Sequence, residues 1–205
     1  MKLPMVSKGL GVVAAMGAAA SLNAAVVLTP GSAGVIFPTA GAVPPGIASM
    51  SDSITDDAGN FSATLESRVV AGAGGLEFWY KVSNNAGSAS PLFGLGINSG
   101  LSLGSVTLDT QGGANSATLG ILGAGGTQVS FLWVSDPIGA GEVSKWAVLI
   151  PPRVTAYTVG TVGVLDGTSE DAKAFVPMAI PEPTTYAGLF ALGLAGFAAF
   201  RKFRS

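Results

Sequence analysis

Carboxylates are the side chains with the most chemistry to offer here, because the 205 residues include no Cys and no His. Their absence excludes thiol nucleophiles, disulfides, Ser-His triads and metal sites built on thiolate or imidazole. Glu66 and Glu77 could lie on neighbouring strands as the carboxylate pair of a glycan hydrolase, which requires a separation of roughly 5 to 9 Å. Both fall on the polar side of their strands, where a solvated charge is the ordinary interpretation. We therefore expect no enzyme, no catalytic residue and no cofactor.

Asp52, Asp56 and Asp57 form a second group of carboxylates, with Asn60 close by in the sequence. Oxygen ligands this near one another could bind calcium, but the spacing lacks the Asp-x-Asp-x-Asp-Gly order of a calcium loop. A polar turn explains the same residues equally well. The three aspartates are therefore weak calcium candidates, and we expect no metal site.

Trp79 is the aromatic residue of greatest interest for binding. Apolar and polar residues alternate over 76–83, and the alternation places Trp79 on the polar side of the segment. Because exposed aromatic rings stack on sugar rings, Trp79 is a candidate sugar contact. The alternative is that a further layer of the protein covers this side of the strand as well.

Short strands are the elements that must position these side chains. The sequence has 30 Gly and 12 Pro and only 11% charged residues, which favours strands and turns over helices. Period-two alternation predicts strands within 61–66, 76–83, 129–133 and 146–150, and the segment 154–164 is long and β-branched. About nine strands at this spacing predict a mainly β fold with a single antiparallel β-sandwich ectodomain over residues 25–180. The Gly- and Pro-rich stretch 34–46 is expected to be a surface loop or an N-terminal edge. Helix is expected at the two ends of the chain, with residues 169–173 as one further candidate.

The charge of this central region limits its partners. Residues 25–180 carry eleven acidic and five basic residues, a net charge of −6, whereas the whole chain has a net charge of −2. Phosphate contacts require clustered Lys and Arg, so we expect no nucleic acid partner.

Residues 1–24 have the order of a secretory signal peptide. Lys2 and Lys8 precede a run of small and apolar residues at 9–20, and Ala24 follows as the candidate residue for signal-peptidase cleavage. The run is shorter than the ~20 residues that span a bilayer. We therefore expect an N-terminal signal helix that signal peptidase removes.

Residues 181–205 have three parts: a Pro-Glu-Pro motif at 181–183, an uncharged apolar stretch at 184–200 and a basic end at 201–205. The residues of interest are Pro181, Glu182 and Pro183 for processing and Arg201, Lys202 and Arg204 for membrane topology. As a helix at ~1.5 Å per residue, the apolar stretch is about 26 Å long, slightly less than a ~30 Å hydrocarbon core. Long basic side chains extend to the interface, so we expect a C-terminal transmembrane helix with its basic end in the cytoplasm.

The order of these three parts resembles the PEP-CTERM sorting signal, and the resemblance covers 25 of the 205 residues. It implies that exosortase, a membrane cysteine peptidase, cuts near the Pro-Glu-Pro motif and passes the protein to the cell surface or matrix. Hosts of such proteins are typically Gram-negative bacteria that make exopolysaccharide. The same type of domain is also catalogued as an ice-binding protein C-terminal domain, a label that is not evidence of activity.

These features predict an exported protein that passes through the inner membrane to the cell surface or extracellular matrix. The expected role is non-catalytic and structural or adhesive. The expected partners are signal peptidase, exosortase, the membrane before cleavage, and exopolysaccharide. The alternatives are a polysaccharide-binding protein, a carboxylate-dependent glycan hydrolase, or an ice-binding protein, although the sequence has no Thr-x-Thr ladder for a flat ice-binding face.

Overall fold

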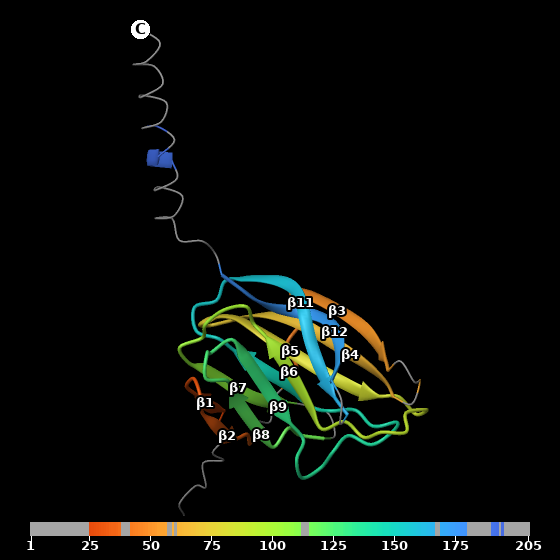
Figure 1. Ribbon diagram of the computed structural model, residues 1–205. Coiled ribbons are helices and arrows are strands. Elements are labelled where there is room, and N and C mark those ends of the chain that lie inside the picture. The colour runs from red at the N-terminus through yellow and green to blue at the C-terminus, as the bar shows by residue number, and fades with distance from the viewer. Residues whose placement is uncertain are drawn as a thin grey trace, which may run out of the picture.

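The computed structural model describes residues 25–37, 42–56, 59, 61–111, 115–166, 169–179, 190–192 and 194. Over these residues the chain is mainly β, and its strands form two antiparallel six-stranded sheets (Figure 1). The expected mainly β fold with antiparallel sheets is therefore confirmed. The expected signal helix lies outside the described residues, and of the expected C-terminal helix only residues 190–192 and 194 are described, as helical.

The first sheet has the strand order β1-β7-β10-β5-β4-β3, and the second has the order β12-β11-β6-β9-β8-β2. In chain order the strands are β1 (Val26–Leu28), β2 (Ala33–Val35), β3 (Ala48–Thr55), β4 (Ser62–Gly72), β5 (Gly75–Asn84), β6 (Gly94–Asn98), β7 (Val106–Gln111), β8 (Leu119–Leu122), β9 (Gln128–Leu132), β10 (Trp146–Ile150), β11 (Ala156–Leu165) and β12 (Ser169–Met178). The described region thus has more strands than the expected nine. One reason is that β1 and β2 have only three residues each, too few for an alternating pattern to reveal them.

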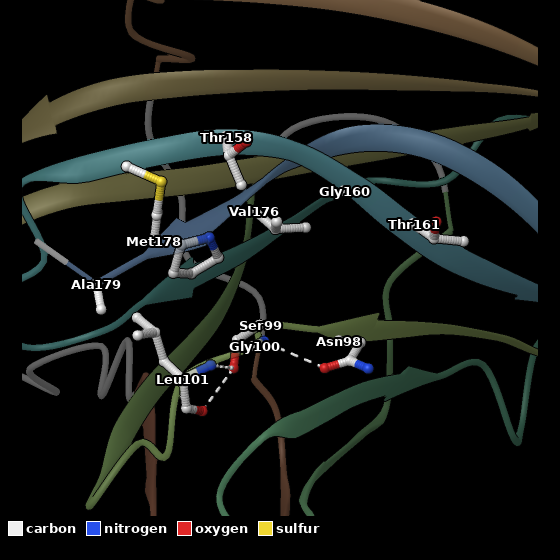
Figure 2. Close-up of a pocket in the computed structure, with 11 residues that line it drawn as sticks. Asn98, Ser99, Gly100, Leu101, Thr158, Gly160, Thr161, Val176, Met178 and Ala179 are labelled. Carbon is white, nitrogen blue, oxygen red and sulfur yellow. Dashed lines mark hydrogen bonds between the residues drawn. The ribbon is translucent and has the colours of Figure 1, made fainter.

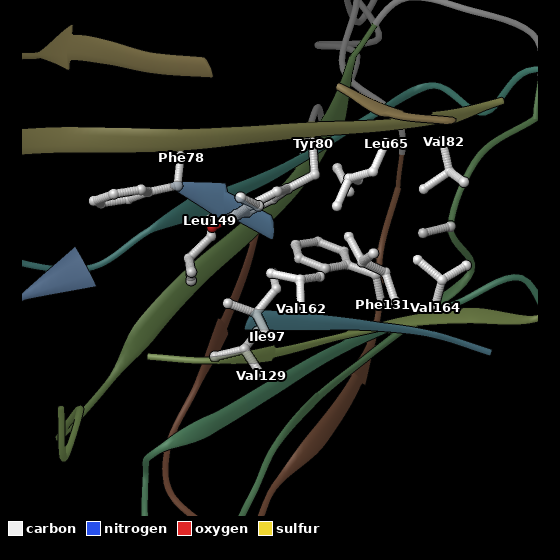
Figure 3. Packing of buried hydrophobic residues seen from close by; sticks show 14 of the residues in the cluster. Leu65, Phe78, Tyr80, Val82, Ile97, Val129, Phe131, Leu149, Val162 and Val164 are labelled. Carbon is white, nitrogen blue, oxygen red and sulfur yellow. The ribbon is translucent and has the colours of Figure 1, made fainter. Parts of the chain in front are cut away.

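The hydrophobic core lies between the two sheets, because the strands turn alternate side chains inward. Phe61, Ala63 and Leu65, which alternation assigned to one side, are all fully buried. Figure 3 shows Leu65 and Tyr80 of the first sheet facing Phe131 of the second across this layer. Alternation therefore identified the inward residues of this segment, whereas in β10 both faces are buried.

Residues 169–173 are not helical, so that expectation is wrong. They begin β12, which pairs antiparallel with β11 through ten consecutive residue pairs from Leu165↔Ser169 to Ala156↔Met178. Ala172, Ala174 and Val176 alternate into the core. Five residues are too few to separate a helical period from a strand period, and the long pairing with β11 decides the conformation.

Side chains of the first sheet hold the free edge of β12. The backbone N–H of Lys173 donates to Asp52 Oδ2 at 2.7 Å, and the N–H of Phe175 donates to Ser67 Oγ at 3.2 Å. The Tyr80 hydroxyl donates to the carbonyl oxygen of Phe175 at 2.7 Å. An unpaired strand edge is a template for aggregation, and these hydrogen bonds occupy part of it. They also fix the strand that leads to the C-terminal segment.

Candidate functional site

Trp79 is buried, with 2% of its surface exposed, so the expectation of an exposed sugar contact is wrong. It does lie on the outer side of the first sheet, but this side is covered. Trp79 packs with Trp146 at 6.3 Å between ring centroids, and Val70 and Val148 join the same cluster. Val43, from the Gly- and Pro-rich stretch before β3, also packs against it. Alternation placed Trp79 on the correct side of the strand, and packing then excludes its ring from solvent.

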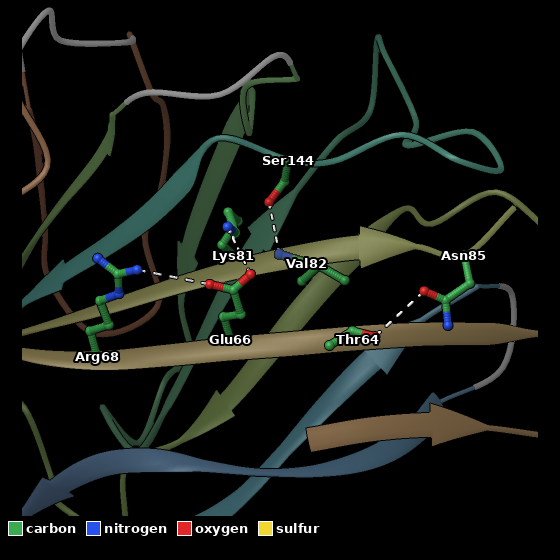
Figure 4. Close-up of polar contacts among 7 residues, drawn as sticks. All are labelled: Thr64, Glu66, Arg68, Lys81, Val82, Asn85 and Ser144. Carbon is green, nitrogen blue, oxygen red and sulfur yellow. Dashed lines mark hydrogen bonds and ion pairs between the residues drawn. The ribbon is translucent and has the colours of Figure 1, made fainter. Parts of the chain in front are cut away.

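Glu66 and Glu77 lie on neighbouring strands, as expected, but they are not opposite one another. Glu66 lies opposite Lys81, whereas Glu77 lies opposite Val70, so the two backbone positions are offset by four residues, about 13 Å along the strands at ~3.3 Å per residue. A glycan hydrolase requires roughly 5 to 9 Å. Glu66 Oε1 lies 2.8 Å from Lys81 Nζ, and Glu66 Oε2 lies 4.0 Å from the Arg68 guanidinium (Figure 4). Glu77 accepts a hydrogen bond from the Trp79 indole at 3.1 Å.

The cations beside Glu66 also contact an aromatic ring. The guanidinium carbon of Arg68 lies 4.6 Å from the ring centroid of Trp146, and Lys81 Nζ lies 5.1 Å from it. These distances are within the range of a cation–π interaction. The polar side chains on this part of the first sheet therefore satisfy one another and seal the tryptophan cluster.

Two of the three weak calcium candidates, Asp52 and Asp56, accept hydrogen bonds from the backbone of different segments. Asp52 Oδ2 accepts the hydrogen bond from Lys173, and Asp56 Oδ1 accepts one from the N–H of Phe61 at 3.0 Å. Asp57 lies outside the described residues. Within the described part of the chain, no group of three or more Asp or Glu residues could hold a metal ion. Asp52 and Asp56 instead fix the backbone.

The outer face of the second sheet carries a hollow of about 460 Å³, which we call the outer trough. Gly96 and Gly163 form its floor, and Gln128, Ser130, Thr161 and Asp171 stand around it. The floor arises from register, because Gly163 of β11 lies opposite Gly96 of β6, and Gly96 lies opposite Ser130 of β9. The sequence did not reveal this site, and the available signal was Gly163 inside the predicted strand segment 154–164.

A second hollow of about 500 Å³ lies beside the end of β12. It shares Asn98 and Thr161 with the lining of the outer trough. Figure 2 shows Thr158, Val176 and Met178 of the β11–β12 hairpin on one side and Leu101 on the other. Ala179 also lines it, so this hollow is located where the chain leaves the sandwich.

The segment that follows β12 is where the chain resembles known proteins. Residues 179–202 match the PEP-CTERM protein-sorting motif. The chain carries this sorting motif. The match begins at the residue directly after Met178, the last residue of β12. No curated protein and no solved structure matches the chain.

The PEP-CTERM motif implies export, membrane-associated sorting and processing by exosortase. Its Pro181, Glu182 and Pro183 lie outside the described residues, as do Arg201, Lys202 and Arg204 at its basic end and the candidate cleavage residue Ala24. In the part of the chain that is described, we find no helix with the length and apolar character needed to cross a membrane. Within residues 179–202, the structure describes Ala179, residues 190–192 and residue 194. It therefore shows that the motif continues directly from β12, the edge strand held by Asp52, Ser67 and Tyr80.

Proposed function

We propose that this chain is an exported cell-surface or extracellular-matrix protein with a non-catalytic structural or adhesive role. Signal peptidase removes residues 1–24 after Ala24, residues 184–200 hold the chain in the inner membrane, and exosortase cuts near Pro181–Pro183. The processed sandwich then joins the surface or exopolysaccharide matrix of a Gram-negative host. The observation that carries the proposal is the PEP-CTERM motif, which follows the last strand of the sandwich without an intervening linker.

The arrangement of the carboxylates favours a non-catalytic role. Glu66 and Glu77 are offset by four residues along their strands, and each is engaged by a neighbouring side chain. Asp52 and Asp56 accept backbone hydrogen bonds. The hydrogen bonds and ion pairs of these carboxylates are made within the sandwich, which suits a structural protein outside the cell.

The test is to express the full chain in two hosts that differ only in exosortase, and to measure intact mass and fractionation. We expect a mass that starts near residue 25 and ends near residue 181, with surface release, only where exosortase is present. A variant with Pro181, Glu182 and Pro183 all changed to Ala should stay uncut and membrane-bound. Pro45→Ala, which removes an exposed Pro before β3, is the matched control and should be processed normally. The same uncut C-terminus in both hosts would contradict the proposal and leave a simple membrane anchor.

A further inference from the structure

Gly96 is a strand glycine that neither backbone conformation nor core packing explains. Its φ is not in the left-handed region, and a Cβ built on it would meet Gln128 Nε2 at 3.8 Å and Gly163 O at 3.9 Å, both ordinary contacts. In contrast, a Cβ at Gly120 would approach Leu108 to 2.5 Å, and one at Gly160 would approach Val176 to 2.6 Å. Glycine inside a strand weakens it, and it often marks a place where a ligand approaches the backbone closely.

Gly163 completes the floor of the outer trough. A Cβ there would come within 2.8 Å of Ser169 Oγ, the end of a flexible side chain, and its φ is also outside the left-handed region. The row Asp171–Gly163–Gly96–Ser130 crosses four neighbouring strands, a span of about 14 Å at ~4.8 Å between strands. The two glycines therefore leave an elongated depression that is wider than one sugar ring.

The side chains around the trough are available to a ligand. Within the described part of the chain, the side chains of Gln128, Ser130, Thr161 and Asp171 form no hydrogen bond or ion pair with one another or with other described residues. This contrasts with the outer face of the first sheet, where Glu66 pairs with Lys81. An amide, two hydroxyls and a carboxylate offer both donors and acceptors, which is the set that recognises sugar hydroxyl groups.

The geometry points to a neutral polysaccharide as the occupant of the outer trough, and we propose that this is the binding site of the sandwich. An extended peptide is disfavoured, because β6 and β11 are interior strands and offer no free edge for strand addition. An anionic polymer is disfavoured because the described lining includes Asp171 but no Lys or Arg. The inference rests on the proposed function, since a matrix polysaccharide reaches only an exported protein.

The test uses the full chain in a zwitterionic detergent without a sugar headgroup, applied to an array of neutral and acidic polysaccharides and extended peptides. We expect binding to at least one neutral polysaccharide, with at least a tenfold loss of affinity in Gly96→Val. The valine fills the trough from its floor, and its β-branched side chain suits a strand, so the thermal midpoint should be unchanged or raised. Gly87→Val, in a turn where a Cβ meets nothing within 4 Å, is the matched control and should bind normally.

A second variant, Gln128→Ala, removes a wall group without adding bulk and should also weaken binding. Absence of binding to every neutral polysaccharide, or binding that Gly96→Val leaves intact, would overturn the inference. Binding only to acidic polymers or to peptides would overturn the ligand class. Gly96→Val should be processed and released normally in the exosortase-containing host. Absence of binding by the wild-type chain with normal release therefore rejects the trough alone, whereas failed processing of the wild-type chain with Gly96-dependent binding rejects the sorting proposal alone.

Discussion

Replacing Tyr80 with Phe tests whether the first sheet holds β12 by specific hydrogen bonds. The change removes one hydroxyl group and keeps the ring, which is 1% exposed and packed in the core. The lost interaction is the 2.7 Å hydrogen bond to the carbonyl oxygen of Phe175. The neighbouring bond from the Phe175 N–H to Ser67 Oγ, at 3.2 Å, remains. The substitution therefore removes one of the described bonds between the sheets at this edge.

The expected loss of stability depends on the carbonyl oxygen of Phe175, which loses its hydrogen-bond donor. A neutral hydrogen bond contributes about 0.5–1.5 kcal/mol net, and an orphaned buried acceptor costs about 1–3 kcal/mol. Phe175 is only half-buried, so water reaches part of this site and the lower half of the second range applies. We expect the free energy of unfolding to fall by about 1–2 kcal/mol, equivalent to a thermal midpoint lower by roughly 3–6 °C for a domain of this size.

Urea unfolding followed by tryptophan fluorescence measures this change, because Trp79, Trp133 and Trp146 are all buried. Tyr157→Phe is the matched control. It makes the same chemical change on β11, where Tyr157 is 37% exposed, and should alter stability by less than about 0.5 kcal/mol. Equal effects of the two substitutions, both below about 0.5 kcal/mol, would refute the clamp.

Two further predictions concern buried aromatic residues. Trp79→Ala should lower the free energy of unfolding by about 3–5 kcal/mol in the same urea assay, because it opens a cavity beside Trp146; a loss below about 1 kcal/mol would mean that Trp79 is not packed. Burial raises the pKa of Tyr80 well above its ordinary value of 10.0, so the folded state resists ionisation of this phenol. Its neutral form contributes stability that is fully present below about pH 10 and is lost as the pH rises further, by about 1.4 kcal/mol per pH unit. Urea unfolding from pH 9 to 11.5 should show this loss in the wild type, and the same slope in Tyr80→Phe would contradict the assignment.

The alternating strands were predictable because one residue in two must face the core. The same rule identifies which residues share a side, but it does not reveal whether that side is covered. Trp79 shows the limit, since Val43 comes from a distant loop and Trp146 from β10. The unbroken apolar run of β10, from Trp146 to Ile150, was a sign that both of its faces are buried.

The outer trough could not be predicted from local sequence. Gly96 and Gly163 lie on β6 and β11, and only the register between these strands makes them neighbours. Loop lengths and core packing together set that register, and neither is a local pattern. The sorting motif is the opposite case, because its three parts are consecutive in the chain and require no fold to bring them together.

The position of β12 links the last step of folding to the sorting motif. It is the last strand of the sandwich, and Ala172, Ala174 and Val176 complete the core, so the domain cannot close until this strand has emerged. The PEP-CTERM motif begins at the next residue, so under the proposed function β12 and the motif leave the membrane channel almost together. Folds dominated by non-local pairing close slowly, in milliseconds to seconds. Under the proposed function, processing by exosortase therefore competes with the final step of folding. Early cleavage would act while β12 is still unpaired, and late cleavage would act after β12 has joined the sheet.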